Sequence, residues 1–579
     1  MPVETAREHA ANIAWRLFAL SRELPDKRAV AFATSRRYRS RRVYATITFG
    51  ELERASAFYA EILRAGGFRP GMRTLLLVKP GVEFIALTFA LFRLGAVPVL
   101  IDPGMGKESF LDCVARVEPE GMVAVPTACF ARLLYPRFFK SVTHLATLGR
   151  RWLWGGCRLP FLRLRLETAP SAGEGETRLS AAESAADEAP IYNSSAEELA
   201  AILFTSGATG PAKGVEYEHR IFATQLAMLA SHFGVSRDDV DLATFPLFAL
   251  LSIGLGMTAV MPHMDFSRPA AAEPMAIVEA IADWRCTFSF GSPALWGKVA
   301  VWCNEKEIVL PSLRKVLMAG APVMPIIHER LRRILPQGTA HTPYGATECL
   351  PVADIQSAEV LAETAAVTKD GGGICVGRPL PGVEVAIIRI TEEEIASWNS
   401  LATLPPGTVG EITVKGPTVT RRYFRDERAT RLAKISCGDA CWHRMGDLGY
   451  LDSRGRLWFC GRKSHRVETS RGMLYPICCE ALFLRHPEVK RAALVGIGPR
   501  PRQVPAIVVE PVRMPASPAE EEILREALLA IASRHPLTMA IRDILFHPAF
   551  PVDSRHNAKI KREELSKWAA EIMAKYSSP

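Results

Sequence analysis

The segment 204–214, FTSGATGPAKG, constrains the fold of this chain more than any other feature. It follows the apolar run 199–203, which predicts a buried strand that ends directly in a loop. Small residues let backbone N–H groups converge on an anion, threonine hydroxyls add donors, and a lysine adds positive charge. The segment therefore predicts a phosphate site, to which we assign Thr205, Ser206, Gly207, Thr209, Gly210 and Lys213.

Helical and extended patterns alternate around this loop. The first third of the chain predicts helices at 51–65 and 84–94 and strands at 74–78 and 97–101. Such alternation is typical of α/β folds with parallel sheets, and 579 residues exceed the size of one ordinary domain. We expect a large α/β N-terminal domain with parallel-rich sheets flanked by helices, joined by a hinge to a small α+β C-terminal domain. The predicted limits are 1–460 and 461–579, with a polar insertion or linker at about 167–195.

The charge balance narrows the class of partner. There are 71 Lys and Arg against 61 Asp and Glu, a net charge of +10, which favours anionic ligands such as nucleotides or an acidic membrane surface. The basic cluster 36–42 lacks the aromatic or zinc-finger pattern of nucleic-acid readers, so no nucleic acid is expected. The longest apolar runs are too short or carry Arg93, which predicts no transmembrane segment, and the composition is compatible with peripheral membrane association.

The N-terminal and cysteine patterns indicate the compartment. No basic region followed by an apolar stretch and a cleavage site opens the chain, and twelve cysteines in 579 residues do not suggest a disulfide framework. We therefore expect a cytoplasmic protein with reduced thiols. Cys437, Cys441 and His443 lie close in sequence, but without a fourth ligand ordinary packing is the better interpretation than a metal site.

Four further motifs follow the loop in order: MAGAP at 318–322, HTPYGATE at 341–348, HRMGD at 443–447 and GRKSH at 461–465. The loop itself lacks the Gly-Lys-Ser/Thr of a Walker A motif. Together these motifs resemble the signatures of the adenylate-forming superfamily, which includes acyl-CoA synthetases, peptide-synthetase adenylation domains and firefly luciferase. The resemblance covers most of the chain and implies an AMP-forming ligase that uses ATP and Mg²⁺.

The chemistry of individual side chains agrees with this resemblance. Tyr344 offers an aromatic face to a purine, Thr347 a hydroxyl to phosphate, and Glu348 a hard oxygen ligand to Mg²⁺. The resemblance implies that Asp447 holds the ribose hydroxyls, which suits a carboxylate because it accepts two hydrogen bonds. The other residues that it assigns to ATP and Mg²⁺ are Gly320 and Ala321 in the adenine-pocket turn, Gly345, Arg462 near the ribose and phosphate, and Thr205 as a second metal ligand.

The C-terminal motifs resemble the mobile part of the superfamily. Segment 461–465 resembles the hinge between half-reactions, with His465 in place of the usual aspartate. Asn557-Ala558-Lys559 occupies the place of a Ser-Gly-Lys motif whose lysine enters the active site during adenylation. An ammonium there offsets the charge that develops between carboxylate and α-phosphate. The expected catalytic residues are Lys559, Glu348, Thr347 and Lys213.

Several stretches resemble more narrowly the β-lactone synthetases of long-chain olefin biosynthesis: GAVPVLIDPGMG, FPLFAL, TPYGATECLPV, WFCGRKSHRVET and FPVDSRHNAKI. Glu468 and Arg471 also stand where CoA-forming relatives have a lysine and a glycine. The resemblance implies that ATP converts a long-chain 2-alkyl-3-hydroxy acid to its acyl-adenylate, after which its own 3-hydroxyl closes a β-lactone. Neighbouring olefin-pathway enzymes are the implied protein partners. His341 and His465 are both candidates for the base, and a structural or hinge role is equally open for each.

The sequence leaves alternatives open for the acyl pocket and for the group that accepts the activated acyl chain. The run 245–261, segment 290–294 and Trp296 are the candidate acyl pocket, although such apolar runs are usually core. A fatty acyl-CoA synthetase or acyl-AMP ligase would share every adenylation residue, and a luciferase-like oxygenase is a more distant enzyme. A catalytically silent acyl- or nucleotide-binding subunit of a lipid-synthesising assembly is the alternative of another class. The presence of Lys213 and Glu348 argues against silence.

Overall fold

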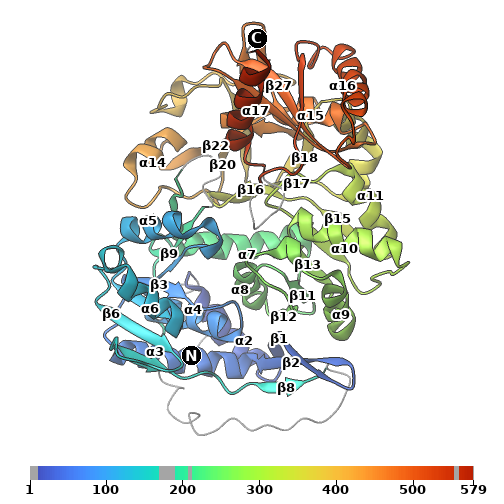
Figure 1. The fold of residues 1–579 in the computed structure, drawn as a ribbon. Helices are drawn as coiled ribbons and strands as arrows, with labels where there is room; N and C mark the ends of the chain where they lie inside the picture. Colours follow the sequence, from blue (N-terminus) through green and yellow to red (C-terminus); the bar gives the residue numbers. More distant parts are fainter. Residues whose placement is uncertain (1–10, 169–189, 206–210, 553–559, 578–579) are drawn as a thin grey trace.

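The computed structural model describes residues 11–168, 190–205, 211–552 and 560–577. Two parallel-rich sheets form the N-terminal half, an antiparallel sheet follows, and a small α+β body carries the C-terminus at the top of the view (Figure 1). This arrangement confirms the predicted fold class. In the described residues, no helix combines the length and the apolar character needed to cross a bilayer.

The first sheet has eight strands in the order β15-β14-β13-β11-β12-β1-β2-β8. All pairs from β15 to β1 are parallel, and β2 and β8 add an antiparallel edge. The strands are β1 (Arg28–Tyr38), β2 (Arg41–Thr48), β8 (Arg165–Glu167), β11 (Val240–Ala243), β12 (Thr258–Met261), β13 (Phe288–Gly291), β14 (Lys315–Met318) and β15 (Thr339–His341).

The second sheet has seven strands in the order β10-β9-β4-β3-β5-β6-β7, parallel except for the β10–β9 pair. Its strands are β3 (Arg73–Leu77), β4 (Val97–Leu100), β5 (Gly121–Ala124), β6 (His144–Leu148), β7 (Cys157–Leu159), β9 (Leu199–Phe204) and β10 (Gly214–Glu218). The predicted strands at 74–78, 97–101 and 199–203 agree with β3, β4 and β9. Because β9 lies inside this sheet, the loop that follows it starts at the carboxyl edge of parallel strands, where α/β proteins bind ligands.

Local sequence explains the helices between these strands. Thr48 and Glu51 form a capping box at the start of α3 (Phe49–Ala65). The neighbouring α4 (Val82–Leu94) is apolar on nearly all sides and buried, and it ends at Gly95 with φ 70°. A Cβ at Gly95 would come within 2.4 Å of the Tyr192 ring, so this turn requires glycine. The other helices of the N-terminal half are α2 (Ile13–Glu23), α5 (Lys107–Val117), α6 (Pro126–Leu134), α7 (His219–Phe233), α8 (Pro246–Gly254), α9 (Pro274–Trp284), α10 (Pro293–Glu305) and α11 (Pro325–Ile334).

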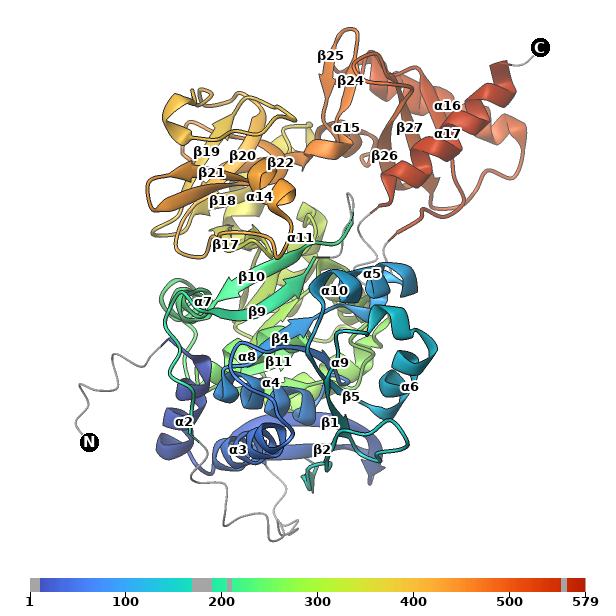
Figure 2. The same cartoon turned by 90° about the vertical axis from the view of Figure 1, so that its left-hand side faces the viewer.

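The third sheet is antiparallel throughout, in the order β16-β17-β18-β23-β22-β20-β19, with β21 on β22. Its strands are β16 (Tyr344–Ala346), β17 (Cys349–Asp354), β18 (Ile374–Pro379), β19 (Glu384–Ile388), β20 (Gly410–Lys415), β21 (Lys434–Cys437), β22 (Ala440–Leu451) and β23 (Leu457–Arg462). Helix α14 (Glu427–Ala433) packs beside β22. This sheet carries residues of three of the ordered motifs, on β16, β22 and β23, and it lies above β9 and β10 in the view of Figure 2.

The C-terminal body begins after β23. A hairpin of β24 (Val467–Thr469) and β25 (Gly472–Leu474) precedes a three-stranded sheet in which β27 pairs antiparallel with β26 and parallel with β28. Apolar side chains of helices and sheet form two small cores. The remaining elements are α15 (Pro476–Phe483), β26 (Val489–Ile497), β27 (Val504–Pro511), α16 (Pro518–Ser533), β28 (Asp543–Phe546) and α17 (Arg562–Ser577).

Candidate active site

A cavity of about 2770 Å³ opens where the two parallel-rich sheets, the antiparallel sheet and the C-terminal body meet. Every described residue that the sequence assigned to ATP, Mg²⁺ or catalysis lines this cavity: Thr205, Lys213, Gly320, Ala321, Tyr344, Gly345, Thr347, Glu348, Asp447 and Arg462. Ser206, Gly207, Thr209, Gly210 and Lys559 lie outside the described residues. Residues spread over more than 250 positions thus meet around one space.

The phosphate loop is closed at its base by contacts between Thr205 and Lys213. The Thr205 amide donates to the Lys213 carbonyl over 3.0 Å, and the Lys213 amide donates to Thr205 Oγ1 over 3.3 Å. These bonds continue the β9–β10 pairing, which ends at Gly214 and Phe204. The Lys213 ammonium lies 4.9 Å from the centre of the Tyr423 ring, and this cation–π contact holds the side chain at the cavity.

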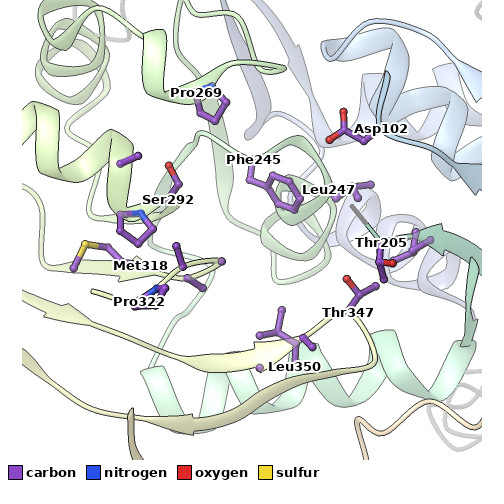
Figure 3. Close-up of a pocket in the computed structure, with 18 of the residues that line it drawn as sticks. Asp102, Thr205, Phe245, Leu247, Pro269, Ser292, Met318, Pro322, Thr347 and Leu350 are labelled. Carbon is purple, nitrogen blue, oxygen red and sulfur yellow. The ribbon is translucent and has the colours of Figure 1, made fainter. Parts of the chain in front are cut away.

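The turn between β16 and β17 presents Thr347 and Glu348. Tyr217 donates to the Thr347 carbonyl over 2.7 Å, and the amide and hydroxyl of Thr420 both donate to the Glu348 carbonyl. Figure 3 shows Thr347 and Thr205 facing the same part of the cavity, across from Met318 and Pro322. The turn is therefore fixed by neighbours on both sides.

The Glu348 carboxylate suits a cation that phosphate oxygens also bind. Its Oε1 accepts a 2.6 Å hydrogen bond from Tyr423, while Oε2 has no partner among the described residues. In that same part of the chain, no three His, Cys, Asp or Glu side chains form a metal-binding group. A single carboxylate completed by phosphate oxygens and water is the coordination that Mg²⁺ takes at nucleotides, so the donor set fits.

Asp447 lies on β22 and also lines the cavity. Its Oδ2 accepts a 2.6 Å hydrogen bond from Tyr344, and Arg462, its register partner on β23, lies 3.0 Å from Oδ1. Burial raises the pKa of Asp447, and the Arg462 guanidinium and the Tyr344 hydroxyl oppose that shift. Oδ1 accepts no hydrogen bond of good geometry in the described residues, so it is available to a ligand hydroxyl.

Gly320 and Gly345 stand at positions where the backbone geometry favours or requires glycine. Gly320, in the turn between β14 and α11, has φ 93°, a conformation that favours glycine. A Cβ at Gly345 would lie 2.6 Å from the Cys349 carbonyl, so the β16–β17 hairpin can close only with glycine there. Both residues line the cavity.

The apolar end of the cavity agrees only in part with the predicted acyl pocket. Phe245 to Phe248, Leu251 and segment 290–294 line it, and the Phe248 and Phe290 rings stack at 4.1 Å. The rest of the run 245–261 forms the end of α8 and the buried strand β12, which belong to the core. Trp296 is fully buried in another core cluster and does not reach the cavity.

The two candidate bases occupy different environments. His341 does not line the cavity, because it is buried and its Nδ1 pairs with Asp354 over 2.7 Å. His465 does line the cavity, and burial together with Arg562, Arg462 and Arg500 lowers its pKa to about 3. The imidazole of His465 is therefore neutral near physiological pH.

Three further side chains at the site were not assigned from sequence. Tyr423 binds Glu348, and Lys434 is buried with Nζ donating to Thr420 Oγ1 over 3.2 Å. Burial lowers the pKa of Lys434. His443 lines the cavity with a buried Nδ1 that lacks a hydrogen-bond partner in the described residues, and burial with Lys434 lowers its pKa. Only the proximity of His443 to the motif residue Asp447 could have singled it out.

The comparisons with known proteins agree with this geometry. A family model described as AMP-binding enzyme matches residues 18–424, more than half of the chain. The chain belongs to the AMP-binding enzyme family. Membership of this family, together with the relatives below, confirms the predicted AMP-forming ligase. Among its relatives, the olefin beta-lactone synthetase of Xanthomonas campestris is 43% identical over 97% of this chain and 98% of its own length. The olefin beta-lactone synthetase of Stenotrophomonas maltophilia is also 43% identical, over 97% and 99%.

Two solved structures share the fold of this chain. The amide bond synthetase McbA from Marinactinospora thermotolerans is 23% identical, with a TM-score of 0.74 over 96% of this chain and 99% of its own. ATP-bound MatB from Rhodopseudomonas palustris is 21% identical, with a TM-score of 0.74 over 97% and 99%. At these identities the likeness concerns the fold.

Proposed function

We propose that this AMP-binding enzyme activates a long-chain 2-alkyl-3-hydroxy fatty acid with ATP and closes it to a β-lactone, as a step of olefin biosynthesis. The observation that carries the proposal is the single cavity that joins a nucleotide region, with Glu348 and Asp447, to an aromatic wall at Phe248 and Phe290. The two synthetases at 43% identity over nearly full length support this acceptor chemistry.

For the adenylation step we propose a role for each site residue. Asp447 accepts hydrogen bonds from the ribose hydroxyls, with Arg462 beside it. Lys213, Thr347 and the loop after Thr205 bind the phosphates, and Glu348 with Thr205 forms the site for Mg²⁺. Mg²⁺, when bound, would offset phosphate charge as the carboxylate approaches. Lys559 enters from the C-terminal domain and offsets charge at the α-phosphate, and Gly320, Ala321, Tyr344 and Gly345 surround the adenine.

Ring closure follows from the proposed intermediate. The 3-hydroxyl oxygen of the substrate attacks its own acyl carbon, and the bond from that carbon to the AMP phosphate oxygen breaks. AMP leaves with the electron pair, and the hydroxyl proton passes to the leaving phosphate and from there to water. The four-membered ring forms only when the chain folds back on itself, which the aromatic wall favours by excluding water from the reacting end. No external thiol is needed, in agreement with Glu468 and Arg471 at the positions that line the CoA route in thioester-forming relatives.

We further propose that the chain divides at residue 461 and turns about a hinge at 461–465. Gly461 has φ 134°, and a Cβ there would lie 3.1 Å from Pro476 Cδ. Lys463 donates to the Thr391 carbonyl over 2.9 Å and lies 3.2 Å from Glu411, contacts that a rotation would exchange. As partners we propose neighbouring enzymes of olefin biosynthesis, and as location the cytoplasm.

The deciding experiment is mass spectrometry of lipid products, without heating, after incubation of the purified protein with ATP, Mg²⁺ and a synthetic 2-alkyl-3-hydroxy acid. The proposal predicts a product one water lighter than the acid, formed with stoichiometric AMP in the absence of CoA. A parallel reaction with CoA and a simple fatty acid is the control. Product formed only as a CoA thioester would contradict lactone synthesis and leave adenylation intact.

A further inference from the structure

A stretch around α6 and β7 has an exceptional charge pattern. Residues 126–166 contain no Asp or Glu. They contain eight basic residues: Arg132, Arg137, Lys140, Arg150, Arg151, Arg158, Arg163 and Arg165. The chain as a whole is nearly balanced, with 71 basic and 61 acidic residues, so much of the net charge of +10 arises in this one stretch. Such a concentration produces a local positive field.

The same stretch exposes large apolar side chains. Leu153 is fully exposed, Trp152 is 65% exposed, and the large apolar side chains of Phe130, Leu133, Leu134 and Phe161 in the same stretch are exposed as well. We call these six residues, with Arg137, Lys140, Arg150, Arg151, Arg158 and Arg163, the α6–β7 surface. Contiguous exposed apolar groups rimmed by polar ones mark sites of interaction.

Hydrogen bonds and a ring stack connect the loop after β6 to α6. Trp154 donates to Thr147 Oγ1 over 3.0 Å, and the same hydroxyl lies 3.5 Å from Cys129 Sγ on α6, which places the loop after β6 beside that helix. Trp152 stacks on Trp154 at 6.0 Å with an interplanar angle of 4°. Figure 1 shows α6 and β6 next to one another at the outer side of the N-terminal half. The surface is therefore an ordered unit.

Most basic side chains of the α6–β7 surface have no acidic partner in the described part of the chain. Among the described residues, no carboxylate lies within salt-bridge distance of Arg137, Lys140, Arg150, Arg151 or Arg163. Arg151 and Arg158 instead donate to the carbonyls of Gly156 and Gly149. These bonds orient the loop and leave the positive charges uncompensated.

The adjoining face of α6 belongs to the active-site cavity. Thr127, Ala128, Ala131 and Tyr135 line that cavity, as do Lys107 and Phe110 of α5. Exposed apolar residues of the α6–β7 surface and residues that line the cavity thus lie on adjoining faces of one short helix. An apolar ligand held at the surface would be within the width of a helix of the cavity.

We propose that the α6–β7 surface docks the enzyme on an anionic lipid bilayer, with Trp152 and Leu153 at the headgroup boundary and the arginines on lipid phosphates. Tryptophan favours this boundary because one end of its ring system is apolar and the other donates a hydrogen bond. Clustered basic residues supply the charge attraction to acidic headgroups. The docking rests on the surface alone, whereas its use, uptake of a long-chain acid from the bilayer, rests on the proposed function.

Vesicle co-sedimentation of the full chain tests the docking without ATP or acid, so its failure would leave the proposed function untouched. We expect binding to vesicles that contain phosphatidylglycerol, weaker binding to pure phosphatidylcholine, and loss of binding at high salt. Each basic residue at such a surface changes partitioning roughly five-fold, so Arg150→Gln with Arg151→Gln should lower it roughly 20-fold. Trp152→Ala with Leu153→Ala should also lower it.

Matched variants away from the surface serve as controls. Arg332→Gln with Arg333→Gln removes another pair of adjacent exposed arginines, and Ile523→Ala removes another exposed apolar side chain. Unchanged pyrophosphate exchange with a short soluble hydroxy acid would show that each surface variant is folded. Equal binding to neutral and anionic vesicles, or equal losses in surface and control variants, would overturn the proposal. Failure to bind vesicles combined with capture by an acidic pathway enzyme would reassign the surface to a protein partner and also overturn it.

Discussion

The Tyr344 hydroxyl donates a 2.6 Å hydrogen bond to Asp447 Oδ2, across 103 positions of sequence. Tyr344 opens β16, Asp447 lies on β22, and Arg462 from β23 approaches the other carboxylate oxygen at 3.0 Å. The pKa of Tyr344 is raised by burial and by this carboxylate, so the phenol stays a donor. The pair therefore joins the proposed adenine and ribose regions in one rigid unit.

Replacing Asp447 tests the proposed ribose contact. Asp447→Asn keeps the shape but removes the charge, and hydrogen bonds to charged groups contribute about 1.5–3 kcal/mol, so we expect KM for ATP to rise roughly 10- to 100-fold. Tyr344→Phe, which removes one donor and keeps the ring, should have a smaller effect. ATP–pyrophosphate exchange measures both. An unchanged KM in a folded Asp447→Asn protein would refute the assignment.

The Glu348–Tyr423 contact leads to a prediction about the Mg²⁺ concentration that the enzyme requires. Glu348→Gln should raise the Mg²⁺ concentration needed for half-maximal exchange at least roughly tenfold, because a neutral amide is a weaker ligand for a hard cation than a carboxylate. Tyr423→Phe frees Oε1 and leaves the charge in place, so its Mg²⁺ requirement should change little. A Mg²⁺ titration at saturating ATP separates the two variants. The metal assignment fails if Glu348→Gln titrates like the parent.

The motif residues of the site could be predicted from the sequence, whereas Tyr423 and Lys434 could not. Segments 204–214 and 341–348 were found because each concentrates several phosphate- or nucleotide-binding groups in one short window. Tyr423 and Lys434 reach Glu348 and Thr420 through the packing of loops and strands far apart in sequence, and no local pattern marks them. In sequence the run 245–261 is uniformly apolar, because burial on both faces gives a helix and a strand the same apolar signature. In the structure it divides into the start of a helix that lines the cavity and a strand of the core.

Asp241 makes stability depend on pH. It is fully buried, accepts a 2.7 Å hydrogen bond from Ser252, and burial raises its pKa from 3.8 to about 7. The folded state therefore binds a proton that the unfolded state releases, and this stabilisation is complete below pH 3.8 and is lost as pH rises through about 7. Asp241→Asn should reduce the loss of unfolding free energy between about pH 5 and about pH 8 by about 2–3 kcal/mol.

Ser252→Ala provides a directional control for that result. Because the Ser252 hydroxyl lowers the pKa of Asp241, its removal should move the stability loss to higher pH. Urea unfolding at a series of pH values measures all three proteins. Parallel pH profiles for the parent and Asp241→Asn would contradict the buried-carboxyl explanation.

The acyl end of the cavity gives a prediction about chain length. Ala294, at the start of α10, lines the cavity beside Ser292 and Pro293, near the stacked rings of Phe248 and Phe290. Ala294→Phe would fill apolar space there, and since overpacking a closed site typically costs 1–3 kcal/mol, the longest alkyl chains should lose about 5- to 100-fold in kcat/KM. Short-chain hydroxy acids should be turned over as before, because their ends do not reach the added ring. Glu305→Gln, at the exposed end of the same helix, is the matched control. Mass spectrometry of competing chain lengths in one reaction reads out the ratio directly, and an unchanged ratio would mean that the alkyl chain leaves the reacting centre by another wall of the cavity.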